Sequence, residues 1–152
     1  MVVETASPAL ARLYEQDFLL WTEKIARLLR AGRLDALDIE HLAEEIEDMG
    51  KSQRREMESR LTVLLAHLLK WGWQREQRSN SWKATVANQR VELRRVFRDS
   101  PSLKNRLPKS LADCYRDAVE GASLETALPV DTFPEFCPFT SEQILDRDFL
   151  PE

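Results

Sequence analysis

The sequence has few of the residues that break helices, form disulfides or bind metals. Its 152 residues include four glycines, two cysteines and two histidines. Few β-branched residues and many Leu, Ala, Glu and Arg accompany this shortage of glycine, and together they favour helix throughout. Cys114 and Cys137 have no metal-binding spacing, and they fit free thiols in a reducing cytoplasm.

Long hydrophobic runs are missing too. The longest uncharged apolar run, residues 61–69, contains Thr62 and His67 and is far shorter than the roughly 20 residues that span a bilayer. Residues 1–10 contain Glu4 and no cationic start, which argues against a secretory signal. With 43% hydrophobic and 32% charged residues, the chain is expected to be a soluble, cytoplasmic globular protein without a membrane partner.

The motifs of the common enzyme classes are also missing. The sequence has no glycine-rich phosphate loop, no CxxC pair, no HExxH and no Ser-His-Asp order. We therefore assign no catalytic residue and expect no resident cofactor, with a divalent metal as the alternative considered below.

What the sequence does contain is a series of amphipathic helices. Apolar residues recur at spacings of three and four, which is typical of helices with one buried face. Asp17 is predicted to interrupt the first helix briefly, Ser81 to cap the third and Pro108 to hinge the fourth. The predicted helices cover residues 8–31, 38–71, 81–99 and 101–124.

The end of the chain has a different composition. Residues 129–152 contain four prolines and are predicted to form an extended tail with one short helix, capped by Thr140. Four helices with short connectors indicate an all-α fold, an antiparallel bundle of about four helices with this tail strapped across it. We expect one domain over residues 1–152, with residues 1–12 as a lead-in.

The middle of the long second helix has an unusual pattern. Leu42, Ile46 and Met49 continue its apolar stripe, but residues 50–56 contain no apolar side chain. We expect the helix to run through this segment without a break, with Gln53 facing a neighbouring helix.

Charge is segregated along the chain. Residues 71–107 carry nine basic and three acidic side chains, whereas residues 108–152 carry three basic and ten acidic ones. A basic middle between acidic ends fits either a nucleic-acid surface or oppositely charged helices that lie side by side. We favour the second interpretation because the net charge of the chain is −4.

Several long segments resemble a known family. They include YEQDFLLW, LLRAGRLDALDIEHLAEEIEDMGKSQRREMESRL, LLAHLLKW, RSNSW, FPEFCPF and QILDRDFLP, between Tyr14 and Pro151. These segments are similar to the bacterial family catalogued as domain of unknown function number 29. The resemblance implies an all-helical, soluble, bacterial cytoplasmic protein, and it transfers no catalytic residue.

The first candidate site lies near the start of the second helix. His41, Glu44, Glu45 and Asp48 are spaced so that they project from one side of that helix. Carboxylates and an imidazole on one face can supply part of a divalent metal site, although such sites take ligands from two or more helices. The structural alternative, which we favour, is carboxylates stabilised by the positive end of the helix dipole.

A second candidate is the polar line formed by Glu56, Arg60 and His67, which borders the apolar residues of 61–68. Such groups would serve acid–base catalysis in an open cleft. We favour a structural role, in which Glu56 pairs with Arg60 and His67 reaches a carboxylate or a carbonyl.

The third candidate is a basic ridge on the third helix, made of Lys83, Arg90, Arg94 and Arg98. Basic side chains at spacings of seven, four and four can follow a phosphate backbone. A solvated or acid-paired helix face explains the same spacing, and we favour it.

These observations predict a non-enzymatic helical module that binds another protein. The alternatives are a metal-dependent enzyme that uses the face of His41, Glu44, Glu45 and Asp48, and a nucleic-acid binder that uses the basic ridge. The sequence makes no prediction about the oligomeric state.

Overall fold

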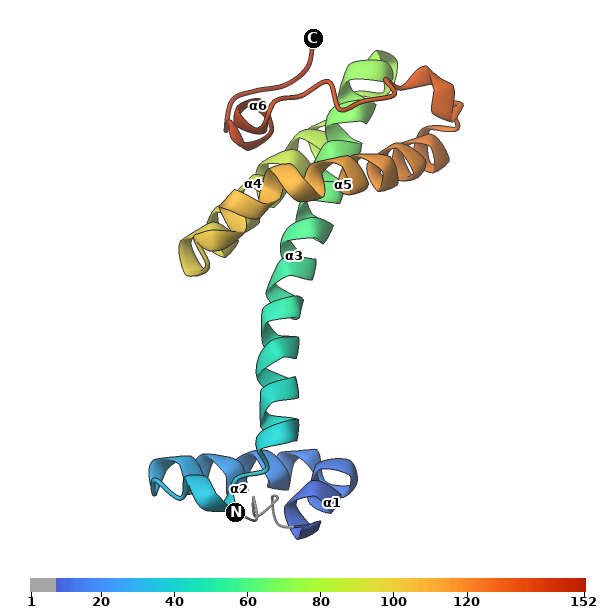
Figure 1. Ribbon diagram of the computed structural model, residues 1–152. Coiled ribbons are helices and arrows are strands. Elements are labelled where there is room, and N and C mark those ends of the chain that lie inside the picture. Colours follow the sequence, from blue (N-terminus) through green and yellow to red (C-terminus); the bar gives the residue numbers. More distant parts are fainter. Residues whose placement is uncertain (1–7) are drawn as a thin grey trace. The chain divides into compact units, whose positions relative to one another are not determined.

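The computed structural model describes residues 8–152, and within that range every regular element is a helix. This confirms the predicted all-α class. Residues 1–7 of the predicted lead-in lie outside the described residues, and residues 8–12 already belong to the first helix. The helices, shown in Figure 1, are α1 (Pro8–Gln16), α2 (Phe18–Arg30), α3 (Ile39–Trp73), α4 (Asn80–Asp99), α5 (Ser102–Thr126) and α6 (Ser141–Leu145).

The helix boundaries follow local capping chemistry. Asp17 separates α1 from α2, as predicted, and its side chain accepts a hydrogen bond from the Leu20 amide as the N-cap of α2. The cap of α4 is Ser79, not the predicted Ser81, because the Ser79 hydroxyl accepts from the Trp82 amide. Thr140 caps α6, as predicted, in a reciprocal capping box with Gln143.

Pro108 does not hinge the fourth helix, contrary to the prediction. It lies inside α5, which runs from Ser102 to Thr126 as one helix. A proline removes the amide that would bond to the carbonyl four residues earlier, here that of Lys104. Both Pro108 and Lys104 are exposed, so water can satisfy that carbonyl.

The chain forms two compact units, one up to Ser52 and one from Gln53 onward. In the described part of the first unit, α1 packs against α2 and the short turn Leu34–Ala36 closes over α2. Its core contains Trp21, Ile25 and Leu37, with partly buried apolar side chains around them.

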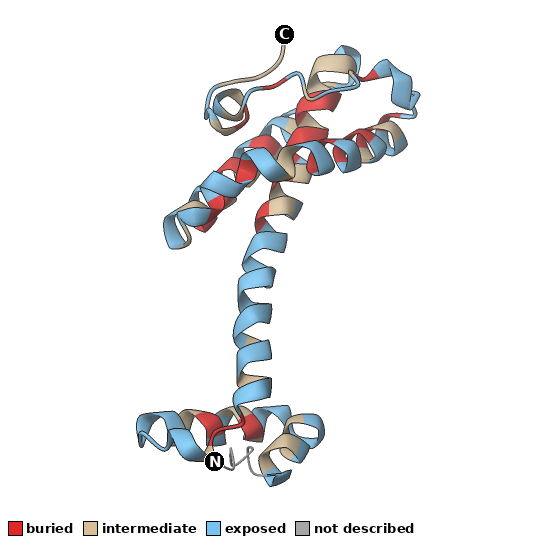
Figure 2. Cartoon of the chain, viewed as in Figure 1, coloured by how far each residue is buried: buried red, intermediate tan, exposed pale blue. Residues whose placement is uncertain are grey.

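The second unit holds a larger core. Its most buried side chains come from the second half of α3, where Met57, Leu61, Leu64 and Leu68 are fully buried. The helices α4 and α5 lie side by side and add further buried residues, which Figure 2 marks in red along both. Three tail residues complete this core, namely Phe133, Phe139 and Ile144.

The helix α3 is continuous, but the burial of its apolar stripe is not. The helix continues through Gly50, as predicted. However, Ile46 is 60% exposed and Met49 is 68% exposed, and every residue from Ile46 to Glu56 faces solvent (Figure 2). The expectation that Gln53 contacts a neighbouring helix is therefore wrong.

Both cysteines are free thiols in the second unit. Cys114 is buried in α5, and its thiol donates to the Glu58 carbonyl oxygen. Cys137 is partly buried in the tail, where its thiol donates to the Phe139 carbonyl oxygen. Burial raises the pKa of both thiols.

None of the helices that the structure describes is both long and apolar enough to span a bilayer.

Candidate functional site

The polar residues at the start of α3 form a closed hydrogen-bonded cluster in the first unit. Asp38 is almost fully buried and accepts two hydrogen bonds, from the Trp21 indole at 3.1 Å and from His41 Nδ1 at 2.7 Å. The His41 ring stacks on Tyr14, with ring centroids 4.0 Å apart, and the Tyr14 hydroxyl donates to Glu45. The cluster therefore connects α1, α2 and α3.

The same hydrogen bonds set the acid–base behaviour of the cluster. The hydrogen bond to the Asp38 carboxylate raises the pKa of His41, and burial opposes it. The hydrogen bond to Glu45 is the main cause that raises the pKa of Tyr14 to about 12. At neutral pH, Tyr14 is thus a hydrogen-bond donor and not a nucleophile.

The four residues of the proposed metal face have separate surroundings. His41 and Glu45 bond to Asp38 and Tyr14, whereas Glu44 and Asp48 are exposed. Among residues 8–152, no three His, Cys, Asp or Glu side chains lie together as a set that could hold a metal ion. The metal site stays a prediction, and it would need ligands from outside this helix face.

Sequence reasoning missed the side-chain role of Asp38, the first residue of the predicted second helix. The available signal was its position three residues before His41, which places the two side chains together on one side of a helix.

The predicted polar line on α3 is split between two places. Arg60 lies 3.6 Å from Glu56 and 4.0 Å from Glu92 of α4, so the predicted Glu56–Arg60 pair is present. Both members are more than a third exposed. His67 is not part of this pair, because its Nδ1 donates to the Val63 carbonyl oxygen at 2.9 Å. Burial lowers the pKa of His67.

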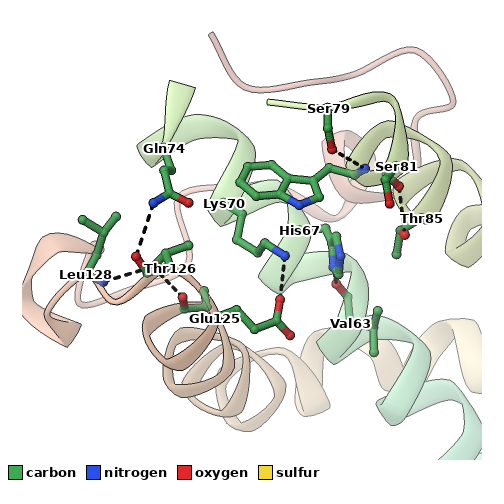
Figure 3. Close-up of polar contacts among 12 residues, drawn as sticks. Val63, His67, Lys70, Gln74, Ser79, Ser81, Thr85, Glu125, Thr126 and Leu128 are labelled. Atoms are coloured by element: carbon green, nitrogen blue, oxygen red, sulfur yellow. Dashed lines mark hydrogen bonds and ion pairs between the residues drawn. The ribbon is translucent and has the colours of Figure 1, made fainter. Parts of the chain in front are cut away.

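A buried lysine lies next to His67, one turn further along α3. Lys70 is 5% exposed, and its ammonium group donates to the Glu125 carboxylate of α5 (Figure 3). It also lies 4.5 Å from the centroid of the Trp82 ring. Sequence reasoning missed this residue, although a lysine between Leu68 and Trp71 on an apolar stripe was an available signal. Glu125 and Trp82 supply the partners that a buried cation needs.

The predicted basic ridge is wrong at Arg90. Lys83, Arg94 and Arg98 are exposed, but Arg90 is 3% exposed and its guanidinium faces the tail. It donates to three backbone carbonyl oxygens, at 2.8 Å to Ile144, 2.8 Å to Phe149 and 3.2 Å to Gln143. A buried guanidinium whose donors are occupied by the chain itself cannot bind a phosphate.

One face of α3 in the first unit has no partner within the described chain. Ile39, Ile46 and Met49 are 57%, 60% and 68% exposed, and their spacings of seven and three place them on one side of the helix. Residues 40–48 carry five carboxylates and no lysine or arginine. We call the exposed residues Ile39, Ile46, Met49, Glu40, Glu44, Glu47 and Asp48 the acidic α3 face; Glu40 and Glu47 flank the apolar residues, and Glu44 and Asp48 lie further round the helix.

Comparison with known proteins gives a family and no function. No curated protein and no solved structure matches the chain. The family model described as "Domain of unknown function DUF29" matches residues 13–150, which is nearly the whole sequence. The chain therefore belongs to the DUF29 family.

Proposed function

We propose that this protein is a non-enzymatic, cytoplasmic bacterial module that binds another protein through the acidic α3 face. The exposure of Ile39, Ile46 and Met49 carries this proposal. Exposed apolar residues gathered on one helix face, with charged residues around them, are typical of surfaces that a partner covers.

The charges of the acidic α3 face define the chemistry of the partner. The four carboxylates of this face, of which Asp48 lies 3.9 Å from Lys51, attract a cationic surface and oppose an acidic one. The apolar residues lie on a helix, and a second helix with its own apolar stripe packs well against such a surface. The partner that fits is therefore a basic amphipathic helix.

The other polar clusters support a binding role over a catalytic one. Inside the first unit, Asp38 accepts from Trp21 and His41, and Glu45 accepts from Tyr14. Inside the second unit, Lys70 and Arg90 donate to carboxylate or carbonyl groups. Groups whose hydrogen bonds are taken by the protein are poorly placed to act on a substrate.

We also retain the antiparallel four-helix bundle and the strapped tail as a proposal for the arrangement of this module. Within residues 53–152, two sets of contacts favour a strapped tail. Arg90 of α4 bonds to tail carbonyls, and the Tyr115 hydroxyl of α5 donates to the Pro134 carbonyl oxygen at 2.6 Å.

A photo-crosslinking amino acid at Met49 tests the proposed surface in living cells. We expect one discrete adduct at Met49, which an Ile46→Glu change abolishes. The control position is Leu124, which is 85% exposed on α5 and lies outside the acidic α3 face. The partner identified in the adduct is then purified without the crosslink. Its affinity for the wild type and for Ile46→Glu is measured at two salt concentrations.

The expected partner binds the wild type in a salt-sensitive way and binds Ile46→Glu at least about tenfold more weakly. An adduct pattern at Met49 that equals the pattern at Leu124 would overturn the proposal. An adduct with a second copy of this chain would identify self-association as the use of this face.

A further inference from the structure

The second unit contains a hollow that the proposed function does not use. It lies between α3 and α5, with a volume of ≈ 800 Å³, and its walls are residues 54–63 of α3 and residues 106–117 of α5. A hollow of this size is within the range of small-molecule sites.

Four cationic side chains line this hollow, two from each helix. They are Arg54 and Arg55 of α3 and Arg106 and Lys109 of α5. Among the described residues, none of the four has a carboxylate within 4.0 Å, although nine other ion pairs form. The four positive charges therefore face a common space without a counter-ion of their own.

The carboxylates near these cations are held by other groups. Glu58 lies one turn after Arg54, but its Oε1 accepts a hydrogen bond from the Ser110 hydroxyl at 3.0 Å. Asp113 lies 3.2 Å from Arg116, which is not part of the lining. Glu58 keeps its negative charge in this hydrogen bond, so four cations stand against one carboxylate at this end of the hollow, and the excess positive charge attracts an anion.

The two ends of the hollow differ in charge. Ser110 bonds to Glu58, and Glu125 bonds to Lys70, so residue numbers rise in the same direction along α3 and α5, and residues 54, 55, 106 and 109 lie toward one end of the hollow. Asp113 and Asp117 of α5 line the other end, with the Thr62 hydroxyl and the apolar Val63 of α3. A ligand that fits this gradient carries its negative charge at one end only.

We infer that this hollow binds a small phosphorylated molecule, with its phosphate groups between Arg54, Arg55, Arg106 and Lys109. Guanidinium groups donate two parallel hydrogen bonds to phosphate oxygens, and a bound phosphate relieves the repulsion among the four cations. The part of the ligand without phosphate lies toward Asp113 and Asp117.

Calorimetric titration of the full chain with pyrophosphate, at an ionic strength of about 0.15 M, tests this assignment. We expect binding that Arg54→Gln with Arg106→Gln weakens at least about tenfold, because both changes remove charged hydrogen bonds. The matched control is Arg75→Gln with Lys104→Gln, which removes the same charge from two exposed residues outside the hollow. The control pair should change the affinity less than about twofold, since distant charges are screened.

Glu58→Gln gives a second readout with the opposite sign. The amide oxygen still accepts from Ser110, but the negative charge beside the cations is gone, so pyrophosphate should bind more tightly. Three results would each overturn the inference. They are an equal loss of affinity in Arg54→Gln with Arg106→Gln and in the control pair, no binding of pyrophosphate to the wild type, and weaker binding of pyrophosphate to Glu58→Gln. A single-stranded oligonucleotide that binds more tightly than pyrophosphate, and that the control pair weakens equally, would instead assign these cations to a nucleic-acid surface.

Discussion

The two histidines of this protein differ in what their ring nitrogens contact. His41 donates to the Asp38 carboxylate, which favours the protonated ring and raises its pKa. His67 is half-buried and bonds to a backbone carbonyl, and burial disfavours the charged ring and lowers its pKa. The stability contributed by the two residues therefore depends on pH in opposite directions.

We predict that His41 titrates above 6.5 and His67 below 6.5, the ordinary value for both. The contribution of His41 to stability is complete below about 6.5 and is lost as pH rises through its higher folded-state pKa. The contribution of His67 is complete above about 6.5 and is lost as pH falls through its lower folded-state pKa. Imidazole proton shifts in NMR spectra measure both values, and His67→Gln assigns the signals. Titration of both rings together near 6.5 would contradict the cluster around Asp38.

Arg90 holds the tail through three hydrogen bonds to its backbone carbonyls. Arg90→Met should lower the free energy of unfolding by about 2–4 kcal/mol, because it leaves three tail carbonyls without their charged donor. Urea denaturation measures this loss, and limited proteolysis should find residues 141–152 cut sooner. Arg94→Met, an exposed change on the same helix, is the control and should stay within about 0.5 kcal/mol of the wild type. Equal behaviour of the two variants would show that the guanidinium does not hold the tail.

At the scale of the helices, α3 combines a fully buried stretch with a stretch that is exposed throughout. Its second half supplies fully buried leucines, whereas residues 46–56 face solvent throughout. The contribution of an ion pair along this helix to stability therefore depends on its exposure, and the Arg60 side chain is 35% exposed and partly solvated.

We predict that Arg60→Met costs less than about 1 kcal/mol, because its pairs with Glu56 and Glu92 are partly solvated and at least 3.6 Å long. Leu68→Ala in the same helix should cost about 2–5 kcal/mol, since it opens a cavity in the fully buried core. Midpoints of urea unfolding compare the two. A loss above about 3 kcal/mol for Arg60→Met would mean that Arg60 is far less solvated than its exposure indicates.

Local sequence signals predicted the helices well, but they predicted less well which side chains contact distant parts of the chain. Asp17, Thr140 and the continuous α3 could be predicted because capping and apolar spacing act within a few residues. Arg90 could not be placed correctly, because the carbonyls that bury it come more than fifty residues later. The same limit applies to the hollow between α3 and α5, whose two pairs of cations lie more than fifty residues apart in the sequence.

For the molecule as a whole, the two compact units have cores of different size. In the described part of the first unit the core has three buried hydrophobic residues, whereas the core of the second unit has twenty. Burial of apolar surface is the main favourable term in folding, so the first unit has less to resist local opening.

We predict that backbone amides in α1 and α2 exchange with deuterium faster than those in residues 57–69 of α3. Exchange followed by mass spectrometry measures the difference. Trp21→Ala should raise exchange in the first unit, because it removes a core side chain and leaves the Asp38 carboxylate with one donor fewer. Equal protection of the two regions in the wild type would mean that the units open together.

The two shielded thiols have a practical consequence for labelling this protein. Maleimides and iodoacetamides react with thiolates, and burial keeps both Cys114 and Cys137 in the thiol form. A cysteine placed at Met49, on an exposed turn of α3, would be modified much faster than either native one. Dyes, spin labels or affinity tags can therefore be attached at a chosen position without first replacing the native cysteines.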